Sequence, residues 1–545
     1  MKRVARALVV VLALGLVAGR PQTAPPADAL PTATPIKHLV IIFDENISFD
    51  HYFATYPVAQ NPRGEPAFVA LPGTPGVNGL AGRLLTNNPN RTNPENRELA
   101  SNPFRLDRTQ AATSDQSHDY SDEQLAYDRG AADLFPRHTG RGLPGGTSAF
   151  YTPSVVMGYY DGNTVTALWN YAQHFAMSDN AYADDYGPSA PGAISLVSGQ
   201  TNGFVVGKSV DSTDWVHDGQ GGLTLISDAG PSLDICSDSL YYLNQGTMTG
   251  RNIGDLLNDA GISWGWFQGG FDLTLRTAGG QGCGRTTASH IALRTSADYI
   301  PHHEPFQYYR STANRLHLRP ASVSAIGQSG DPANHQYDVR DFFAAVRAGN
   351  FPAVAFLKPQ AFQDGHAGYS DPLDEQTFLV ETINFLEQQP DWSTTAVIVL
   401  YDDSDGWYDH QMAPVGNGSF DPGRDFLTGV GACGVRGTTP QLGGVAGTGP
   451  VNGRCGPGTR QPFLVISPWA RPNDVDHTLI IQSSVLRFIE DNWLASRRVG
   501  GGSYDATAGS IESLFDFTGP ARVAPLFLND SLGTPVRTPS GRLPG

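Results

Sequence analysis

The sequence predicts an α/β protein built on a doubly wound, mostly parallel sheet, with long loops inserted between the core elements. Two observations support this prediction. The segments 36–43 and 394–403 contain the apolar runs LVIIF and AVIVLY, which are typical of strands that are buried on both faces of a parallel sheet. Other segments repeat apolar residues with the spacing of an amphipathic helix, and they alternate with the strands along the chain.

The first half of the chain should contain one strand, a long excursion and two helices. Residues 36–43 are expected to form the first strand. Residues 60–116 are rich in Asn, Pro and Arg and are expected to form a long insertion, which we call the excursion. Residues 163–175 carry an apolar stripe of helical spacing, and Asn163 is a suitable N-cap for this helix. A second helix is expected at 193–197.

The second half continues the alternation of strands and helices. The expected elements are a strand at 354–357, a helix around 379–386, a buried strand at 394–403, a strand at 462–469 and a helix at 484–493. Between the last two strands, 413–460 is Gly-rich with little apolar content, and we expect it to form a second insertion. No internal repeat is visible.

The N-terminus has the order of a secretory signal. Lys2, Arg3 and Arg6 precede an apolar run at 7–18, and small residues and prolines follow. The run is shorter than the ~20 residues of a membrane-spanning helix. We therefore expect 1–29 to be the signal and cleavage region, 30–35 a Pro-rich lead-in, and 36–545 a single domain. The mature protein is expected to be secreted or periplasmic, without a stable membrane anchor.

Composition narrows the classes of partner. With 40% hydrophobic and 10% aromatic residues, the 545-residue chain is expected to be globular with a sizeable core. Its formal net charge of −17 disfavours electrostatic binding to nucleic acid or to an anionic membrane. The sequence does not indicate an oligomeric state.

Four cysteines in an exported chain suggest two disulfides, for which three pairings are possible. We favour Cys236–Cys283 and Cys433–Cys455. The second pair flanks part of the Gly-rich stretch, where a covalent link would compensate for the small apolar content.

Two of the predicted strands end in neighbouring side chains that carry oxygen. Glu45 and Asn46 follow the first strand, and Asp402 and Asp403 end the strand at 394–403. Ligands of open α/β sheets bind beyond the carboxyl ends of the strands, so these pairs are expected to meet. Carboxylates that converge in this way repel one another unless a cation lies among them. A simple turn after a strand would explain either pair alone, but two such ends favour a metal site.

The chain resembles a known family at several motifs in the family's order. "HLVIIFDENISFDHYF" is similar to the Glu-Asn-x-Ser-Phe-Asp-His signature of the bacterial phosphoesterase family, which contains exported haemolytic and non-haemolytic phospholipases C and related acid phosphatases. Further matching motifs are "DQSHDYSDEQLAYDRGAADLF", "GYYDGNTVTALWNYAQ", "DGHAGYSDP", "YDDSDGWYDH" and "RQPFLVISPWAR". The resemblance covers nearly all of 36–493. Ile47 departs from it, because the family usually has Arg or another polar residue there.

The resemblance implies a fold similar to alkaline phosphatases and sulfatases, with a serine nucleophile after a Gly-Pro. Here that residue is Ser189 in "YGPSAPGAISL". Independently, a serine that opens a helix would place free N–H groups beside a phosphoryl group, although an ordinary helix cap would look the same. The family pattern implies a divalent metal of unassigned identity, and its expected ligands are Glu45, Asn46, Ser189, Asp402 and Asp403.

Four histidines match family positions near the phosphate: His118, His302, His303 and His366. There they would neutralise its charge and protonate a leaving oxygen. The sequence gives no reason to choose between His302 and His303. His410 and His477 also lie near motifs, but we interpret both as structural.

The resulting prediction is an exported, metal-dependent phosphoesterase that acts on a phosphate ester or a phospholipid. A serine esterase using Ser263 is an alternative, because "GISWG" matches a nucleophile elbow. An elbow lies between a strand and a helix, whereas here a helix should end at Gly261 and a strand should follow. A sulfatase would need an Arg that "SAPGA" lacks. A non-catalytic secreted binding protein is the remaining alternative.

Overall fold

The structure, a computed structural model, describes residues 27, 31–141, 152–240, 242–428, 433–437, 439–447 and 449–544. The expected signal and cleavage region, apart from Ala27, lies outside these residues. Within the described part of the chain, no helix has both the length and the apolar character needed to cross a bilayer.

A large sheet of eight strands forms the centre of the fold, in the order β16-β11-β17-β1-β18-β19-β4-β20. The strands are β1 (His38–Asp44), β4 (Ala176–Ser178), β11 (Trp264–Gln268), β16 (Gln336–Asp338), β17 (Val354–Lys358), β18 (Thr395–Tyr401), β19 (Phe463–Ile466) and β20 (Asp474–Asp476). Neighbours are parallel except where β19 pairs with β18 and β4. The predicted mixed α/β architecture with a mostly parallel sheet is confirmed.

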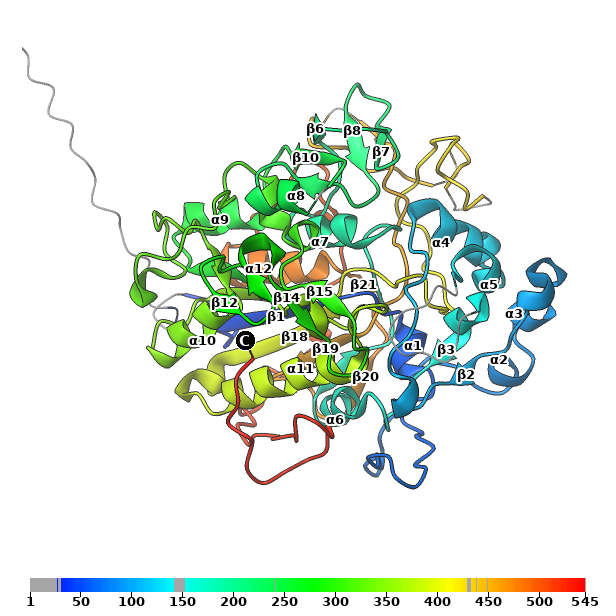
Figure 1. The fold of residues 1–545 in the computed structure, drawn as a ribbon, viewed down its shortest axis with the longest axis horizontal. Helices are drawn as coiled ribbons and strands as arrows, with labels where there is room; N and C mark the ends of the chain where they lie inside the picture. Colours follow the sequence, from blue (N-terminus) through cyan, green and yellow to red (C-terminus); the bar gives the residue numbers. More distant parts are fainter. Residues whose placement is uncertain are drawn as a thin grey trace, which may run out of the picture.

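Helices cover both faces of this sheet, as Figure 1 shows. On one side lie α7 (Ser189–Ser198), α9 (Ile253–Ala260) and α12 (Ser484–Trp493), and on the other α6 (Thr166–His174), α10 (Val339–Arg347) and α11 (Pro372–Glu387). Strands β1, β17 and β18 are buried along their whole length, as the continuous apolar runs predict. The core is therefore packed on both sides of the central strands.

The register of the central strands brings the two acidic strand ends together. β1 lies between β17 and β18, and Asp44 is the partner of Tyr401 across the parallel β1–β18 pair. The residues that follow, Glu45 and Asp402, therefore leave the sheet at the same edge. This is the edge at which open α/β sheets bind ligands.

One predicted cap is wrong. Helix α6 begins at Thr166, and its N-cap is Val165, which makes no side-chain cap. Asn163 instead accepts a hydrogen bond from the amide of Asn61 at 2.9 Å and donates to the carbonyl of Pro66 at 2.8 Å. These longer-range contacts tie the excursion to the core and replace the local capping bond.

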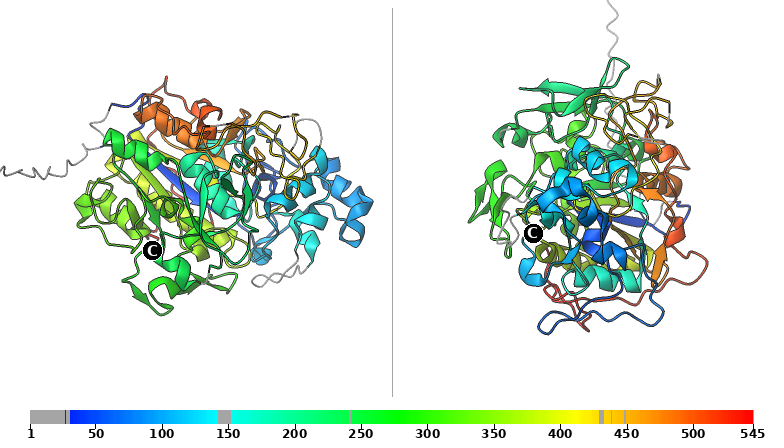
Figure 2. Two further views of the ribbon diagram at one scale, coloured as in Figure 1. Left: turned by 90° about the horizontal axis from the view of Figure 1, so that it is seen from above. Right: turned by 90° about the vertical axis from the view of Figure 1, so that its right-hand side faces the viewer.

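The excursion at 60–116 contains short elements: α2 (Arg83–Thr86), α3 (Pro89–Thr92) and β2 (Phe104–Arg105), which pairs with β3 (Gly158–Tyr159). Together with α1 (Phe49–Phe53), α4 (Tyr120–Tyr127) and α5 (Phe135–His138), the helices of this region gather beyond the end of β1 (Figure 2). In the second insertion, 413–460, the described residues form only isolated bridges.

Small peripheral sheets complete the fold. They are β6 (Phe204–Lys208) with β9 (Gly230–Pro231) and β10 (Gln245–Met248), β7 (Trp215–His217) with β8 (Leu223–Leu225), β12 (Arg276–Thr277) with β13 (Gly280–Gln281), β14 (Thr286–Ala288) with β15 (Thr295–Ala297), and β5 (Ala181–Tyr182) with β21 (Ile480–Ile481). A short helix, α8 (Ile235–Ser239), carries Cys236. Both favoured disulfides, Cys236–Cys283 and Cys433–Cys455, are present, so this pairing is confirmed.

Candidate active site

The loop after β1 is held in one conformation by its own backbone and by a neighbouring loop. Asn46 has a positive φ of 63°, an uncommon conformation in which the chain turns away from the strand. Its amide donates to Oδ1 of Asp402 at 2.9 Å. Helix α1 starts three residues later, and Ser48 caps it by accepting from the amide of His51. Glu45 and Asn46 are thus fixed between a strand and a capped helix.

The loop after β18 is folded around its own carboxylates. Oδ1 of Asp402 accepts from the amide of Asp403 at 2.7 Å, and Oδ1 of Asp403 accepts from the amide of Asp405 at 2.6 Å. One oxygen of each carboxylate is thereby fixed by the backbone. The other oxygen, Oδ2, is left for an interaction outside the loop.

Ser189 is the first residue of α7, and its hydroxyl points at both acidic loops. Oγ lies 3.1 Å from Oε2 of Glu45, 3.1 Å from Oδ2 of Asp403 and 3.4 Å from Oδ1 of Asn46. A serine hydroxyl has one proton and can donate to only one of these oxygens at a time. The structure therefore brings Ser189, Glu45, Asn46, Asp402 and Asp403 into one buried cluster.

The charges of this cluster require a counter-ion. Burial and the neighbouring Asp402 carboxylate raise the pKa of Glu45 and of Asp403 well above the ordinary values. Burial alone would also raise the pKa of Asp402, but the Lys358 ammonium and the hydrogen bonds to its oxygens lower it. Oδ2 of Asp402 is buried and accepts no hydrogen bond from the described residues, whereas Oε1 of Glu45 has Lys358 and His303 as neighbours. An unsatisfied oxygen among crowded carboxylates, all of them hard donors, fits a divalent cation.

Lys358 is a residue that the sequence analysis missed. It ends β17, its side chain is buried, and its Nζ forms an ion pair with Oε1 of Glu45. Nζ also lies 3.3 Å from the carbonyl of Asp44 and packs over the ring of Phe43. A lysine at the end of an apolar strand beside β1 was a detectable signal, of the same kind as Glu45.

The four predicted histidines line one cavity of about 570 Å³ with Ser189. His303 Nδ1 lies 3.0 Å from Oε1 of Glu45, and His118 Nδ1 lies 3.1 Å from Oδ1 of Asp405. His302 Nδ1 is 2.7 Å from the hydroxyl of Tyr242. His302 and His303 thus both face the cavity, with different partners. The other lining residues are Asp115, Asp119, Arg141, Asp228, Ile300, Ala367, Gly368 and Tyr369.

The histidines divide into two classes by environment. Burial lowers the pKa of His302, His303 and His366. Burial would lower the pKa of His118 as well, but the carboxylates of Asp403 and Asp405 outweigh it and raise the pKa well above its ordinary value. The cavity therefore offers one histidine that favours the charged form and three that favour the neutral form.

Several other residues near the site had no place in the sequence analysis. Asp364 forms a buried group with Glu45 and His303, and Asp115 forms a half-buried group with His118 and Asp405. Asp364 and Asp405 lie inside quoted motifs, so the signal was present. Ile47, the departure from the family pattern, is buried in the main hydrophobic core.

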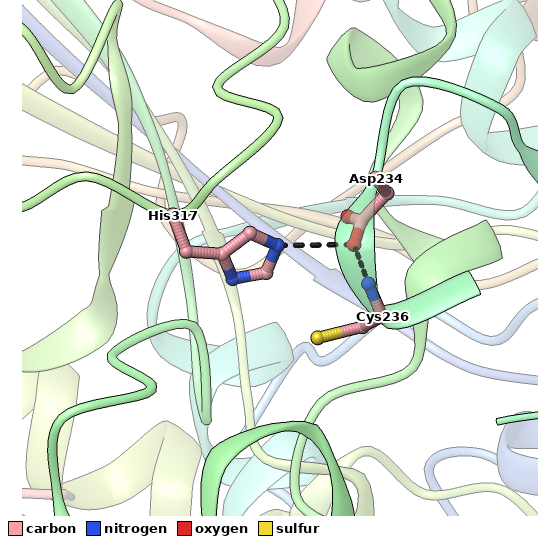
Figure 3. A group of neighbouring side chains, drawn as sticks. All are labelled: Asp234, Cys236 and His317. Carbon is pink, nitrogen blue, oxygen red and sulfur yellow. Dashed lines mark hydrogen bonds and ion pairs between the residues drawn. The ribbon is translucent and has the colours of Figure 1, made fainter. Parts of the chain in front are cut away.

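Two further clusters of possible ligands are structural. In Figure 3, Asp234 accepts from the amide of Cys236 and faces Nε2 of His317 at 3.1 Å. Cys236 is bonded to Cys283, so its sulfur is not a thiolate. In the second cluster, Asp50, Asp409 and His410 surround the buried guanidinium of Arg460, which already supplies the positive charge.

The remaining residues of the sequence analysis lie in structural positions. Ser263 follows the end of α9 and precedes β11, and its Oγ accepts from the amide of Ala353 at 3.0 Å. The strand-then-helix context of a nucleophile elbow is therefore absent at this serine. His410 is bonded to Asp50, and His477 is largely exposed beside Asp179.

Comparison with known proteins gives one family and several relatives. The model of the "Phosphoesterase family" matches residues 36–495. Phospholipase C A of Mycobacterium tuberculosis is 26% identical over 510 residues, which cover 89% of this chain and 78% of the relative. Non-hemolytic phospholipase C of Burkholderia pseudomallei is 24% identical, covering 90% of this chain and 60% of the relative. Hemolytic phospholipase C of Pseudomonas aeruginosa is 23% identical, covering 91% of this chain and 58% of the relative.

Proposed function

The chain belongs to the Phosphoesterase family and is a hydrolase of phosphoric ester bonds, and from this premise we propose that it is an exported, metal-dependent enzyme with Ser189 as its nucleophile. We further propose that 36–545 is a single domain with an alkaline-phosphatase-like core. The observation that carries the proposal is the convergence of Ser189 Oγ on Glu45 and Asp403 at 3.1 Å each.

Five residues would hold the metal: Glu45, Asn46, Ser189, Asp402 and Asp403. The unsatisfied Oδ2 of Asp402 supports this assignment, as does the all-oxygen character of the set. A divalent cation bound there would lower the pKa of the serine hydroxyl and stabilise negative charge on the phosphoryl oxygens. Oxygen ligands of this kind suit hard cations and zinc alike.

Ser189 would attack phosphorus from the N-terminus of α7. Its Oγ forms a new P–O bond while the P–O bond to the leaving alcohol breaks. Water then hydrolyses the phosphoseryl intermediate and releases phosphate from a monoester substrate or a phosphomonoester from a diester substrate. The hydroxyl proton can pass to the carboxylate of Glu45 or Asp403, since both lie within hydrogen-bonding distance. The position at the start of a helix favours the phosphoryl group, because the positive end of the helix dipole lies there.

The histidines would bind the phosphoryl oxygens and protonate the leaving group. His118 is held near Asp405 and tends to be charged, so it suits neutralisation of phosphoryl charge or protonation of the leaving oxygen. His302, His303 and His366 tend to be neutral and line the same cavity. Neutral imidazoles there would donate one hydrogen bond each.

The substrate would be a phosphate ester or a phospholipid. The relatives carry the name phospholipase C, and phosphatidylcholine is therefore a suitable test substrate. The acidic net charge makes nucleic acid an unsuitable partner. Export is supported by the signal-like N-terminal order and by the two disulfides.

One comparison of two assays tests the proposal. Phosphate release from p-nitrophenyl phosphate is compared with diacylglycerol release from phosphatidylcholine, using purified protein supplied with a divalent cation. Turnover of at least one substrate that is lost in Ser189→Ala is the expected result. Absence of both activities in folded, metal-loaded protein would favour the non-catalytic binding protein instead.

A further inference from the structure

One carboxylate of the cavity occupies a position beside the proposed nucleophile. Asp228, in the loop between β8 and β9, accepts a hydrogen bond through Oδ1 from the amide of Ala190 at 2.8 Å. Ala190 is the second residue of α7 and directly follows Ser189. Its amide is one of the first N–H groups of the helix, which have no carbonyl partner within the helix itself.

The other oxygen of Asp228 faces the cavity wall. Oδ2 lies 3.9 Å from Nε2 of His302, whose Nδ1 is held by Tyr242 at 2.7 Å. Asp228 and His302 both line the cavity together with Ser189. The carboxylate is therefore held by the Ala190 amide, and its second oxygen faces His302 next to the space that the phosphoryl group of a substrate would enter.

The positive charge around this space is already matched. The carboxylates of Glu45, Asp402 and Asp403 would balance a divalent ion and the Lys358 ammonium together. The other cationic groups that line the cavity also have carboxylate partners: Arg141 pairs with Asp119 at 3.2 Å, and His118 faces Asp405 at 3.1 Å. An incoming phosphoryl group thus meets a fixed negative charge without a surplus of positive charge.

Resting on the function proposed above, we propose that Asp228 is a specificity-determining residue that selects singly charged phosphodiesters over doubly charged phosphomonoesters. A phosphomonoester has a second pKa near 6 and is a dianion at neutral pH, whereas a diester keeps a single charge. The Asp228 carboxylate repels each added charge on the substrate. Two charges a few ångströms apart in a partly buried site interact strongly enough to change a binding constant by well over tenfold.

The test compares two substrates with the same chromophore in metal-loaded protein at pH 7.5. They are p-nitrophenyl phosphate, the dianion, and bis(p-nitrophenyl) phosphate, the monoanion. We expect the wild-type protein to have the higher kcat/KM for the diester. Asp228→Asn keeps an oxygen that can accept from Ala190 but removes the charge. It should raise the monoester-to-diester ratio of kcat/KM about tenfold, mainly through a lower KM for the monoester.

Two control variants separate charge from structure. Asp228→Glu keeps the charge and should keep the wild-type ratio. Asp238→Asn makes the same change of net charge on a largely exposed side chain beside Lys208, and it should also leave the ratio unchanged. Melting temperatures of all variants show whether they fold.

Each outcome decides a separate question. An unchanged ratio in folded Asp228→Asn, with both activities reduced equally, would make Asp228 a helix cap only and would overturn the inference. A wild-type preference for the dianion would overturn it even if the variants did not fold. Loss of both activities in the wild-type protein would instead contradict the proposed function.

Discussion

The hydroxyl of Ser189 lies 3.1 Å from Oδ2 of Asp403, although the two residues are 214 positions apart in the chain. Ser189 arrives at the start of a helix and Asp403 in the loop after a central strand. Neither position depends on the other for its local structure, since the backbone amide of Asp405 fixes the Asp403 loop. Their meeting at the carboxyl edge of the sheet is therefore a property of the whole fold, and it can be tested one residue at a time.

Removal of the Ser189 hydroxyl should abolish most activity without unfolding the protein. Ser189→Ala deletes the proposed nucleophile and one metal contact, so we expect kcat to fall by on the order of 10³-fold or more. The measurement is steady-state turnover of p-nitrophenyl phosphate or phosphatidylcholine with the melting temperature recorded in parallel.

Ser195→Ala is the matched control for this change. Ser195 lies on the same helix, is buried, and its Oγ has no hydrogen-bond partner among the described residues. Its removal should leave kcat near the wild-type value. Retention of most activity by folded Ser189→Ala would reject the nucleophile assignment.

Ser263→Ala should change stability and leave activity unaltered. The Oγ of Ser263 accepts from the buried amide of Ala353, which also donates to the backbone carbonyl of Ser263. The amide therefore keeps a partner in the variant, and loss of the Oγ contact should cost about 0.5–1.5 kcal/mol in the free energy of unfolding. Urea unfolding and turnover measured on the same preparation separate the two effects. A collapse of activity confined to this variant would favour the serine esterase.

Chelation should remove activity, and a divalent cation should restore it. The reason is that Glu45, Asp402 and Asp403 are buried carboxylates that repel one another, and the Lys358 ammonium would balance one of their charges. Dialysis against a chelator, elemental analysis and re-addition of single metals form the experiment. Full turnover in protein shown to be free of metal would exclude the proposed role.

The sequence predicts the two acidic loops because their signal is local. Glu45 and Asp402 each follow an uninterrupted apolar strand, and parallel central strands end at the same edge of the sheet. The direction of β19 is not encoded in this way, since an apolar run reads the same for a parallel and an antiparallel strand. Asp228 lacks a local signal altogether, because only the tertiary fold places it against Ala190.

The wrong prediction that Asn163 caps α6 has another cause, which is competition between local and longer-range contacts. Asn163 has the character of a helix cap, but its side chain reaches Asn61 in the excursion, and α6 starts without it. Local propensity gives way wherever a longer-range contact satisfies the same polar group.

His410 should make the stability of the protein depend on pH above the acid range. Burial would lower its pKa, but the Asp50 carboxylate at 2.6 Å outweighs burial and raises the pKa above the ordinary value. The stabilisation is therefore complete below the unfolded pKa of ~6.5 and is lost as the pH rises through the folded pKa. His410→Asn should destabilise by about 2 kcal/mol at pH 5.5 and by less at pH 8.5.

Urea unfolding at these two pH values measures the difference directly. His477→Asn is the control, because it replaces a largely exposed histidine that also faces an aspartate. A destabilisation of His410→Asn that is the same at both pH values would show that the His410–Asp50 contact does not depend on charge.

Lys358→Met should cost more stability in metal-free protein than in metal-loaded protein. The ammonium of Lys358 is a buried partner of Glu45, and removing one member of a buried ion pair leaves the other uncompensated, at a cost of ~3–5 kcal/mol. A divalent cation bound by Glu45 would supply part of the missing charge. We therefore expect the cost to shrink when the metal is bound, and the metal-induced rise in Tm to be larger in the variant than in the wild-type protein.

The experiment measures the Tm of the wild-type protein and of Lys358→Met by calorimetry, each with and without a saturating divalent cation. Lys208→Met is the matched control, since Lys208 is an exposed lysine paired with Asp238 far from the acidic loops in sequence, and its replacement should give the wild-type metal response. An equal rise in Tm for Lys358→Met and the wild-type protein would show that the metal does not replace the charge of the Lys358 ammonium at Glu45. The metal would then have to be assigned to ligands that Lys358 does not contact.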